Sequence, residues 1–116
     1  MASKFMSAAD AVALIRDGDT VGLMGGGGGL MEASHVFAAV QARYLATQQP
    51  RQLTVMHALG IGDKKTQGMN CLAHEGLVQR VIGGHWVWSP AMQQLAAQEK
   101  IEAYILPGGV SSQLFR

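Results

Sequence analysis

Short apolar runs alternate along the chain with stretches in which apolar residues recur every three to four positions. The apolar runs are bounded by turn residues and predict four buried strands, at 20–24, 52–59, 78–82 and 101–106. Helical spacing predicts helices from Ser7, from about Met31 to Pro50, over 69–77 and from Ser89. Because strands and helices alternate, the pattern favours an α/β fold in which helices cover both faces of a parallel sheet.

Capping residues sharpen the predicted helix starts. Ser89 is a plausible N-cap, and Pro90 fits the first turn because its missing N–H would have no partner there. Ser111 and Ser112 are also plausible caps, so we expect a helix to begin there, where the chain ends. An element that starts at the last residues is typical of an incomplete fragment, and we expect this chain to be one.

Composition narrows the class of protein. The chain has 116 residues, enough for one domain, with 48% hydrophobic and 15% charged residues. Charged residues usually make up about 25% of a soluble domain. We therefore expect a partner subunit or further chain to cover some apolar surface. The net charge of +1 is scattered rather than gathered in a basic stripe, which argues against nucleic-acid binding.

Membrane insertion and disulfide bonding are not expected. No apolar run reaches the roughly 18 residues that a bilayer-spanning helix needs. Cys71 is the single cysteine, so it has no internal disulfide partner, and we expect a reducing, cytoplasmic location.

Five consecutive glycines, Gly25 to Gly29, follow the first predicted strand, at the edge of an α/β sheet where ligands bind. A phosphate-binding P-loop requires Gly-Lys followed by Ser or Thr, but Leu30 and Met31 follow Gly29. The dinucleotide-binding fingerprint also fails, because leucine occupies position 30 where it requires glycine. The run therefore indicates either a ligand-binding turn of another kind or a flexible turn without a ligand.

The histidines do not form a metal-binding pattern, and we expect no metal site. They are isolated from one another along the chain: His35, His57, His74 and His85. His85 differs because it follows Gly83-Gly84 and precedes Trp86 and Trp88. This aromatic segment is typical of pocket lining, and burial against a neighbouring chain explains it equally well.

No catalytic group can be assigned from the residues alone. We expect Cys71 to be a buried structural cysteine. Glu32 is expected in the first turn of a helix, where it complements the helix dipole. Glu99 and Glu102 are expected near a helix end and its following loop, exposed to solvent.

Several segments together resemble family I (class I) coenzyme A transferases of the acetate/propionate type. These segments are SAADAVALIRDGDTV, the glycine-rich turn with MEA, NCLAHEGLVQRVIGGHW, KIEAYILPGGV and SSQLFR. The resemblance covers nearly the whole chain and implies an open, Rossmann-like domain. Residues 1–116 resemble only the N-terminal portion of the family's α-type domain, so the rest of that domain and the β-type domain would be absent.

The resemblance implies an enzyme that moves CoA from a short-chain acyl-CoA to a carboxylic acid through a glutamyl-CoA thioester. The nucleophilic glutamate would lie in the β-type part, so no catalytic residue is expected in this chain. CoA would be a substrate, and no cofactor is expected. The expected partners are the remaining polypeptide or a β-type subunit, in a homo-oligomer. The implied substrate-binding residues are Gly26, Gly27, Gly28, Gly29, His85, Trp86 and Gly108.

The chain departs from the family pattern at three places. The glycine loop lacks a phenylalanine and has Met31 before Glu32, Gly108 replaces a glutamine, and Trp88 adds bulk. These departures leave open which acyl group is transferred. The alternative is a non-catalytic α/β module that binds a ligand or partner through Gly25–Gly29. A related sugar-phosphate isomerase ranks last, because no Lys or Arg near the glycines could clamp a phosphate.

Overall fold

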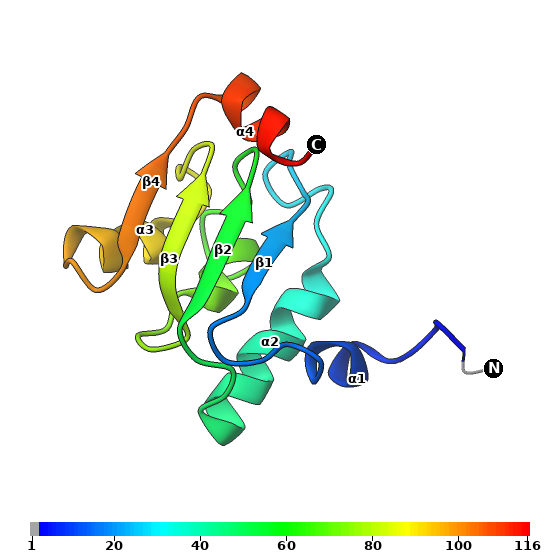
Figure 1. Cartoon of the computed structure of the whole chain (residues 1–116). Helices are drawn as coiled ribbons and strands as arrows, with labels where there is room; N and C mark the ends of the chain where they lie inside the picture. The colour runs from blue at the N-terminus through cyan, green and yellow to red at the C-terminus, as the bar shows by residue number, and fades with distance from the viewer. Residues whose placement is uncertain (1–2) are drawn as a thin grey trace.

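A four-stranded parallel sheet forms the centre of the computed structural model, which describes residues 3–116 (Figure 1). Its strands lie side by side in chain order: β1 (Thr20–Leu23), β2 (Leu53–His57), β3 (Val78–Gly83) and β4 (Glu102–Ile105). All three neighbouring pairs are parallel. The predicted α/β class and all four strands are therefore confirmed.

Within residues 3–116, five helical segments connect and flank the strands. They are α1 (Ala8–Val12), α2 (Ser34–Thr47), the 3-10 helix η1 (Gly68–Leu72), α3 (Pro90–Ala97) and α4 (Gly108–Leu114). Figure 1 shows α2, η1 and α3 behind the sheet, and α4 across the carboxyl ends of the strands. The side chain of Phe115, just after α4, packs over Gly22 on the opposite face from α2. Helices thus contribute to both faces, and most of them lie on one.

The main core lies between the sheet and α2, η1 and α3. Val55 and Val81 are fully buried at the centre of the sheet, and Phe37 and Val40 of α2 belong to the same cluster. Tyr44 is also buried, and its hydroxyl donates to the carbonyl of Glu75 at 2.7 Å. The apolar face predicted for this helix therefore meets the buried strands as expected.

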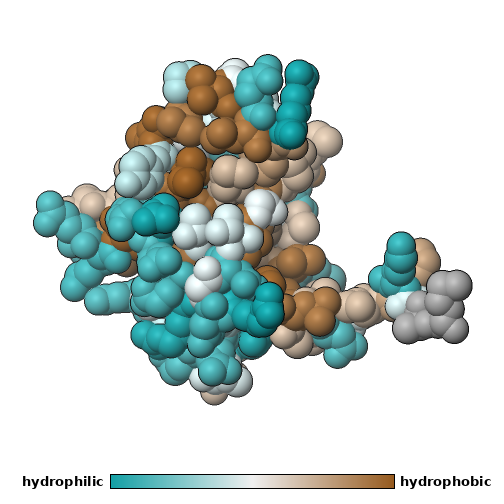
Figure 2. Space-filling view, viewed as in Figure 1, coloured by the Kyte–Doolittle hydropathy of each residue, from teal (hydrophilic) through white to brown (hydrophobic). Residues whose placement is uncertain are grey.

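The opposite face of the sheet changes character along the strands. Near the amino ends it carries polar side chains, including Arg80, whose Nε lies 2.7 Å from Oε2 of Glu102. Towards the carboxyl ends Met56, Ile82 and Tyr104 replace them. Figure 2 shows the same division, with hydrophobic residues gathered in the upper part of the view and hydrophilic residues below. Glu102 is exposed as expected, but it lies in β4 and pairs with Arg80 rather than belonging to a loop.

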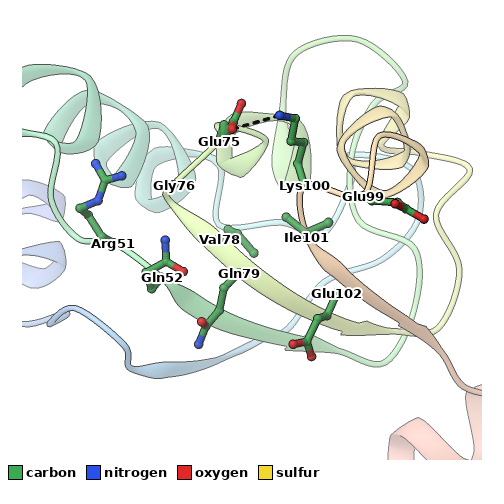
Figure 3. Close-up of a pocket in the computed structure, with 10 residues that line it drawn as sticks. All are labelled: Arg51, Gln52, Glu75, Gly76, Val78, Gln79, Glu99, Lys100, Ile101 and Glu102. Atoms are coloured by element: carbon green, nitrogen blue, oxygen red, sulfur yellow. Dashed lines mark ion pairs between the residues drawn. The ribbon is translucent and has the colours of Figure 1, made fainter.

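Charged side chains line a cavity of about 410 Å³ at the amino ends of β3 and β4 (Figure 3). Arg51 and Lys100 contribute positive charge, and Glu75, Glu99 and Glu102 contribute negative charge. Lys100 and Glu75 form an ion pair at 3.4 Å, although both side chains are largely exposed. Exposed pairs of this kind contribute little to stability because water and salt screen them.

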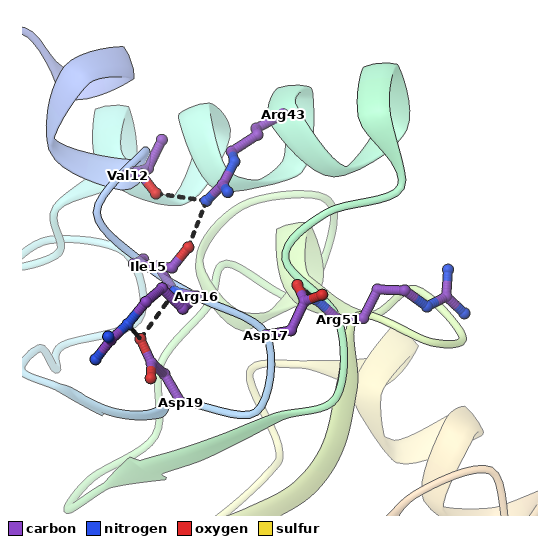
Figure 4. A network of polar contacts seen from close by, with 7 residues as sticks. All are labelled: Val12, Ile15, Arg16, Asp17, Asp19, Arg43 and Arg51. Atoms are coloured by element: carbon purple, nitrogen blue, oxygen red, sulfur yellow. Dashed lines mark hydrogen bonds and ion pairs between the residues drawn. The ribbon is translucent and has the colours of Figure 1, made fainter.

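The turn between α1 and β1 is held by side chain to backbone hydrogen bonds (Figure 4). Arg43 of α2 donates to the carbonyls of Val12 and Ile15, both at 2.7 Å. Arg43 thus ties the end of α1 and the turn after it to α2. Asp17 accepts a hydrogen bond from the backbone N–H of Arg51 at 2.9 Å, which ties this turn to the start of β2.

One predicted helix start and one predicted capping bond are corrected. The last helix begins at Gly108 rather than at the serines, and Ser111 lies within it with its hydroxyl facing the carbonyl of Leu106. Glycine is a poor helix former, so Gly108-Gly109 reads as a break in the sequence. At α3, Pro90 occupies the first turn as predicted, but Ser89 makes no capping bond. Asn70 accepts from the N–H of Ala91 instead, at 3.2 Å.

Within residues 3–116, every helix is too short or too polar to cross a bilayer.

Candidate functional site at the carboxyl ends of the strands

Most of the residues singled out from the sequence lie at one edge of the sheet, because the strands are parallel. The glycine run follows β1, Gly60 and Gly62 follow β2, His85 follows β3, and Gly108 follows β4. A shared edge does not bring all of them together. His85 packs against Gly60, whereas a Cβ at Gly108 would meet no atom within 4 Å. Gly108 therefore lies at the same edge but faces open space.

The glycine loop is ordered by contacts with its neighbours. Gly26 is buried and packs against Leu59, and its carbonyl accepts from the N–H of Met31 at 3.2 Å. Gly28 has a φ of +64°, and a Cβ there would lie 2.9 Å from two ring carbons of Trp88. Both the backbone conformation and the close approach of the indole therefore require glycine at this position.

Glu32 connects the glycine loop to the loop after β2. It precedes α2, which begins at Ser34, so its expected place in the first turn of that helix was wrong. Its Oε1 accepts from the N–H of Gly62 at 2.6 Å. Its Oε2 is buried with no hydrogen-bond partner among residues 3–116. The carboxylate fixes one loop against the other, a role that sequence spacing did not reveal because the two residues are 30 positions apart.

His57, the last residue of β2, and His85, in the loop after β3, differ in exposure. His57 is 2% exposed, and its Nδ1 forms a short hydrogen bond with the carbonyl of Leu59. Burial lowers the pKa of His57 below its ordinary value of 6.5; the Leu59 carbonyl partly opposes this, and the charge of nearby His85 adds to it. The ring packs against Gly83, where a Cβ would meet it. His85 is exposed and lies over Gly60.

The two tryptophans occupy different surroundings. Trp86, predicted as a substrate-binding residue, is 7% exposed within the core, and its Nε1 has no partner in the described part of the chain. Trp88 is half-buried and packs between Gly28 of one loop and Gly60 of the next. The Nζ of Lys64 lies 4.8 Å from the centre of its ring. The residue that contacts the glycine loop is therefore Trp88, not Trp86.

Cys71 is buried, as expected, and its thiol donates to the carbonyl of Thr66 at 3.2 Å. Burial raises the pKa of this thiol, and the negative charges of Asp63 and Glu32 raise it further. A thiol held protonated is a poor nucleophile. Among residues 3–116, no three His, Cys, Asp or Glu side chains gather closely enough to hold a metal ion.

What this edge offers chemically is exposed backbone next to aromatic side chains. Bare glycine allows a substrate group to approach the main chain closely, and main-chain N–H groups can stabilise negative charge that develops on a substrate oxygen. The nearby imidazole of His85 and the indole of Trp88 add polar and apolar contact surface.

A search of family models found no match to the chain, but individual proteins are clearly similar. The acetate CoA-transferase YdiF of Escherichia coli K12 is 42% identical over 111 residues, which cover 96% of this chain and 21% of that protein. The caffeate CoA-transferase of Acetobacterium woodii is 37% identical over 115 residues, 98% of this chain and 22% of that protein.

Solved structures give the same result. The acyl-CoA transferase YdiF of Escherichia coli O157:H7, in a thioester complex with CoA, superposes with a TM-score of 0.90 at 42% identity, over 93% of this chain and 22% of that one. Its apoenzyme also gives a TM-score of 0.90. The chain spans about a fifth of the length of these relatives. The resemblance predicted from the sequence motifs is thereby confirmed: over nearly its whole length, this chain is related to about a fifth of a CoA-transferase.

Proposed function

We propose that this chain is part of a CoA-transferase that moves CoA from a short-chain acyl-CoA to a carboxylic acid through a glutamyl-CoA thioester. The observation that carries the proposal is the 42% identity and TM-score of 0.90 to an acyl-CoA transferase whose structure was solved as a thioester complex with CoA. The nucleophilic glutamate lies outside this chain, in a β-type part. This chain contributes backbone to the acyl pocket and surface to the interface between the two parts.

The proposed reaction consists of exchanges at carbonyl carbons. The glutamate carboxylate attacks the acyl-CoA carbonyl and expels the CoA thiolate, which leaves a mixed anhydride. The thiolate then attacks the glutamyl carbonyl of that anhydride, which releases the donor acid and leaves glutamyl-CoA. The acceptor carboxylate reverses both steps, so no oxidant or cofactor is needed, and CoA is a substrate.

The glycine loop is suited to the tetrahedral intermediates of these steps. Each attack places negative charge on a carbonyl oxygen, and fixed backbone N–H groups stabilise such a charge without reorganising. The loop lies at the carboxyl ends of the strands, and Glu32 and Leu59 hold it in place. We therefore assign Gly26, Gly27, Gly28 and Gly29 to the acyl pocket, with His85 at its border. Trp86 and Gly108 remain sequence-based assignments, since Trp86 is buried and Gly108 stands apart.

The surface beside β1 supports the proposal that residues 1–116 are the N-terminal portion of an α-type domain. An apolar cavity of about 360 Å³ lies between β1 and α2, lined by Val21, Leu23 and Val36 among others. Nearby Met24 and Leu14 are 74% and 70% exposed. A further part of the protein that packs against this apolar surface would remove it from water. We propose that the rest of the α-type domain covers it, within a cytoplasmic homo-oligomer that also contains the β-type part.

A trapping experiment tests this function. The longest polypeptide that contains this chain is incubated with propionyl-CoA or acetyl-CoA and treated with borohydride, which reduces a glutamyl thioester to an alcohol. We expect loss of CoA transfer to added carboxylates and one reduced glutamate, mapped by mass spectrometry, only when acyl-CoA is present. The absence of transfer with every donor and acceptor pair would overturn the proposal and favour a non-catalytic module that binds a ligand or partner through Gly25–Gly29.

A further inference from the structure

Trp88 fills a slot whose walls are bare backbone. Three glycines of two different loops meet it so closely that a Cβ on any of them would collide with it. A Cβ at Gly28 would lie 2.9 Å from the benzene part of the indole, and one at Gly60 would lie 2.5 Å from Cδ1. A Cβ at Gly62 would overlap the backbone carbonyl of Trp88. The indole therefore packs closely against Gly28 of the glycine loop and Gly60 of the loop after β2.

We propose that Trp88 determines acyl specificity: by filling the slot beside Gly28, it restricts the enzyme to short acyl groups. This inference rests on the proposed function and adds to it the residue that limits the length of the acyl group. An acyl group whose carbonyl carbon reaches the glycine loop extends from there into neighbouring space. Where that space is already occupied by the indole, a long or aromatic acyl chain collides and a short one fits.

The indole is fixed in place, so it acts as a stop rather than as a movable side chain. The carbonyl of Trp88 accepts from the N–H of Lys64 at 2.9 Å and from Nδ2 of Asn70 at 3.1 Å. The ammonium of Lys64 lies over the ring at 4.8 Å, a favourable cation–π distance. The two hydrogen bonds hold the backbone that carries the indole, and moving the ring aside would break its contact with Lys64.

The slot should remain open when the indole is removed, because other contacts hold the glycine loop in place. Glu32 binds Gly62, and Leu59 packs against Gly26, and neither contact involves Trp88. Removing a large, closely packed side chain from a rigid site leaves space, and an apolar cavity of about 150 Å³ accepts a benzene-sized ligand. A smaller residue at position 88 should therefore convert the stop into additional acyl pocket.

The experiment compares acyl-CoA substrates in the longest polypeptide that contains this chain. Values of kcat and KM are measured with acetyl-, butyryl- and hexanoyl-CoA for the unaltered protein, Trp88→Phe and Trp88→Ala. Tyr44→Phe is the control, because Tyr44 is a buried aromatic residue of α2 whose hydroxyl lies beside Gly76, at the amino ends of the strands and away from these three glycines. Thermal unfolding of each variant separates loss of stability from a change in specificity.

We expect the hexanoyl-to-acetyl ratio of kcat/KM to rise about tenfold or more in Trp88→Ala, mainly through a lower KM for hexanoyl-CoA, since each methylene in a pocket discriminates by about tenfold or more. Trp88→Phe keeps a ring near Gly60 but withdraws from Gly28, so its ratio should rise less. Tyr44→Phe should leave the ratio unchanged. If Trp88→Ala does not fold, the Trp88→Phe ratio alone decides.

Failure of this inference and failure of the proposed function would give different results. An unaltered protein that transfers CoA, with Trp88 variants whose ratio equals that of the unaltered protein, would overturn the inference and leave the proposed function intact. The same holds if Tyr44→Phe shifts the ratio as much as the Trp88 variants. An unaltered protein inactive with all acyl-CoAs would overturn the proposed function itself.

Discussion

The two edges of the sheet are held together by different kinds of contact. At the amino end, exposed charged side chains such as Lys100 and Glu75 pair across a polar cavity. At the carboxyl end, glycine backbone packs directly against Trp88 and His85, and one carboxylate, Glu32, binds a main-chain N–H. Paired surface charges tolerate change because solvent replaces a lost partner. Close backbone packing does not tolerate change, because a single added methyl group would collide with neighbouring atoms.

Gly62→Ala should have the largest effect. Gly62 has a φ of +140°, and its new Cβ would overlap the carbonyl of Trp88. Backbone strain together with overpacking should lower the free energy of unfolding by about 3 kcal/mol or more, measured by denaturant titration. Gly18→Ala, in the turn before β1, is the matched control. It also has positive φ but no atom within 4 Å, so only strain of about 1–2 kcal/mol is expected. Equal losses would contradict the difference between the edges.

Glu32→Ala should come next. It leaves the N–H of Gly62 without its partner and releases the glycine loop from the loop after β2. We expect a loss of about 1–3 kcal/mol in the free energy of unfolding. Glu75→Ala, which breaks an exposed ion pair at the amino end, should change it by less than about 1 kcal/mol. A Glu32→Ala protein as stable as Glu75→Ala would show that the carboxylate does not hold the two loops together.

Acidification should destabilise the carboxyl end through His57. Burial holds the pKa of His57 below its ordinary value of 6.5, so the folded protein binds its proton less readily than the unfolded chain does. The resulting stability is fully present above about pH 6.5 and is lost as the pH falls from there towards the folded pKa. The free energy of unfolding, measured between pH 7 and 5, should fall less steeply with acidification in His57→Gln than in the unaltered protein. In His35→Gln, an exposed position on α2, it should fall as steeply as in the unaltered protein. If the free energy of unfolding of His57→Gln depends on pH as that of the unaltered protein does, His57 is not the source of the acid sensitivity.

Glu102→Gln should have the smallest effect. The Arg80 guanidinium lowers the pKa of Glu102 through a hydrogen bond and its charge, so this pair stabilises the fold above the unfolded pKa and is lost as the pH falls through the folded one. Because both groups are exposed, we expect no measurable change in the unfolding midpoint in 0.5 M salt and a barely measurable one in low salt. A loss of stability that is the same in low and high salt would show that the Arg80–Glu102 pair contributes more to stability than an exposed ion pair should.

The strands and the order of elements could be predicted because apolar runs and turn glycines are local signals. The motifs of the LAHEGL and GGHW segments also indicated the CoA-transferases to which this chain is similar. The contacts of Glu32 and Trp88 could not be predicted, since each depends on residues that only the folded sheet brings near. Glu32 reads as a residue of a helix start, and its partner Gly62 lies on another loop.

Helix α4 shows a second limit of local signals. Its first residues, Gly108 and Gly109, oppose helix formation by intrinsic preference, so the sequence placed the start at the serines. In the structure the helix begins directly after Pro107, which ends the connection from β4. Where the packing of a chain end decides its conformation, residue preferences give the wrong boundary.

Hydrogen–deuterium exchange with and without acyl-CoA tests the central claim, that the glycine edge is the substrate site, most directly. In the longest polypeptide that contains this chain, acetyl-CoA should slow exchange in the peptide covering Gly25–Gly29 and in the one covering 58–62. Exchange in the peptide covering 99–102, at the charged amino end, should stay the same. Protection at 99–102 with none at Gly25–Gly29 would contradict the account.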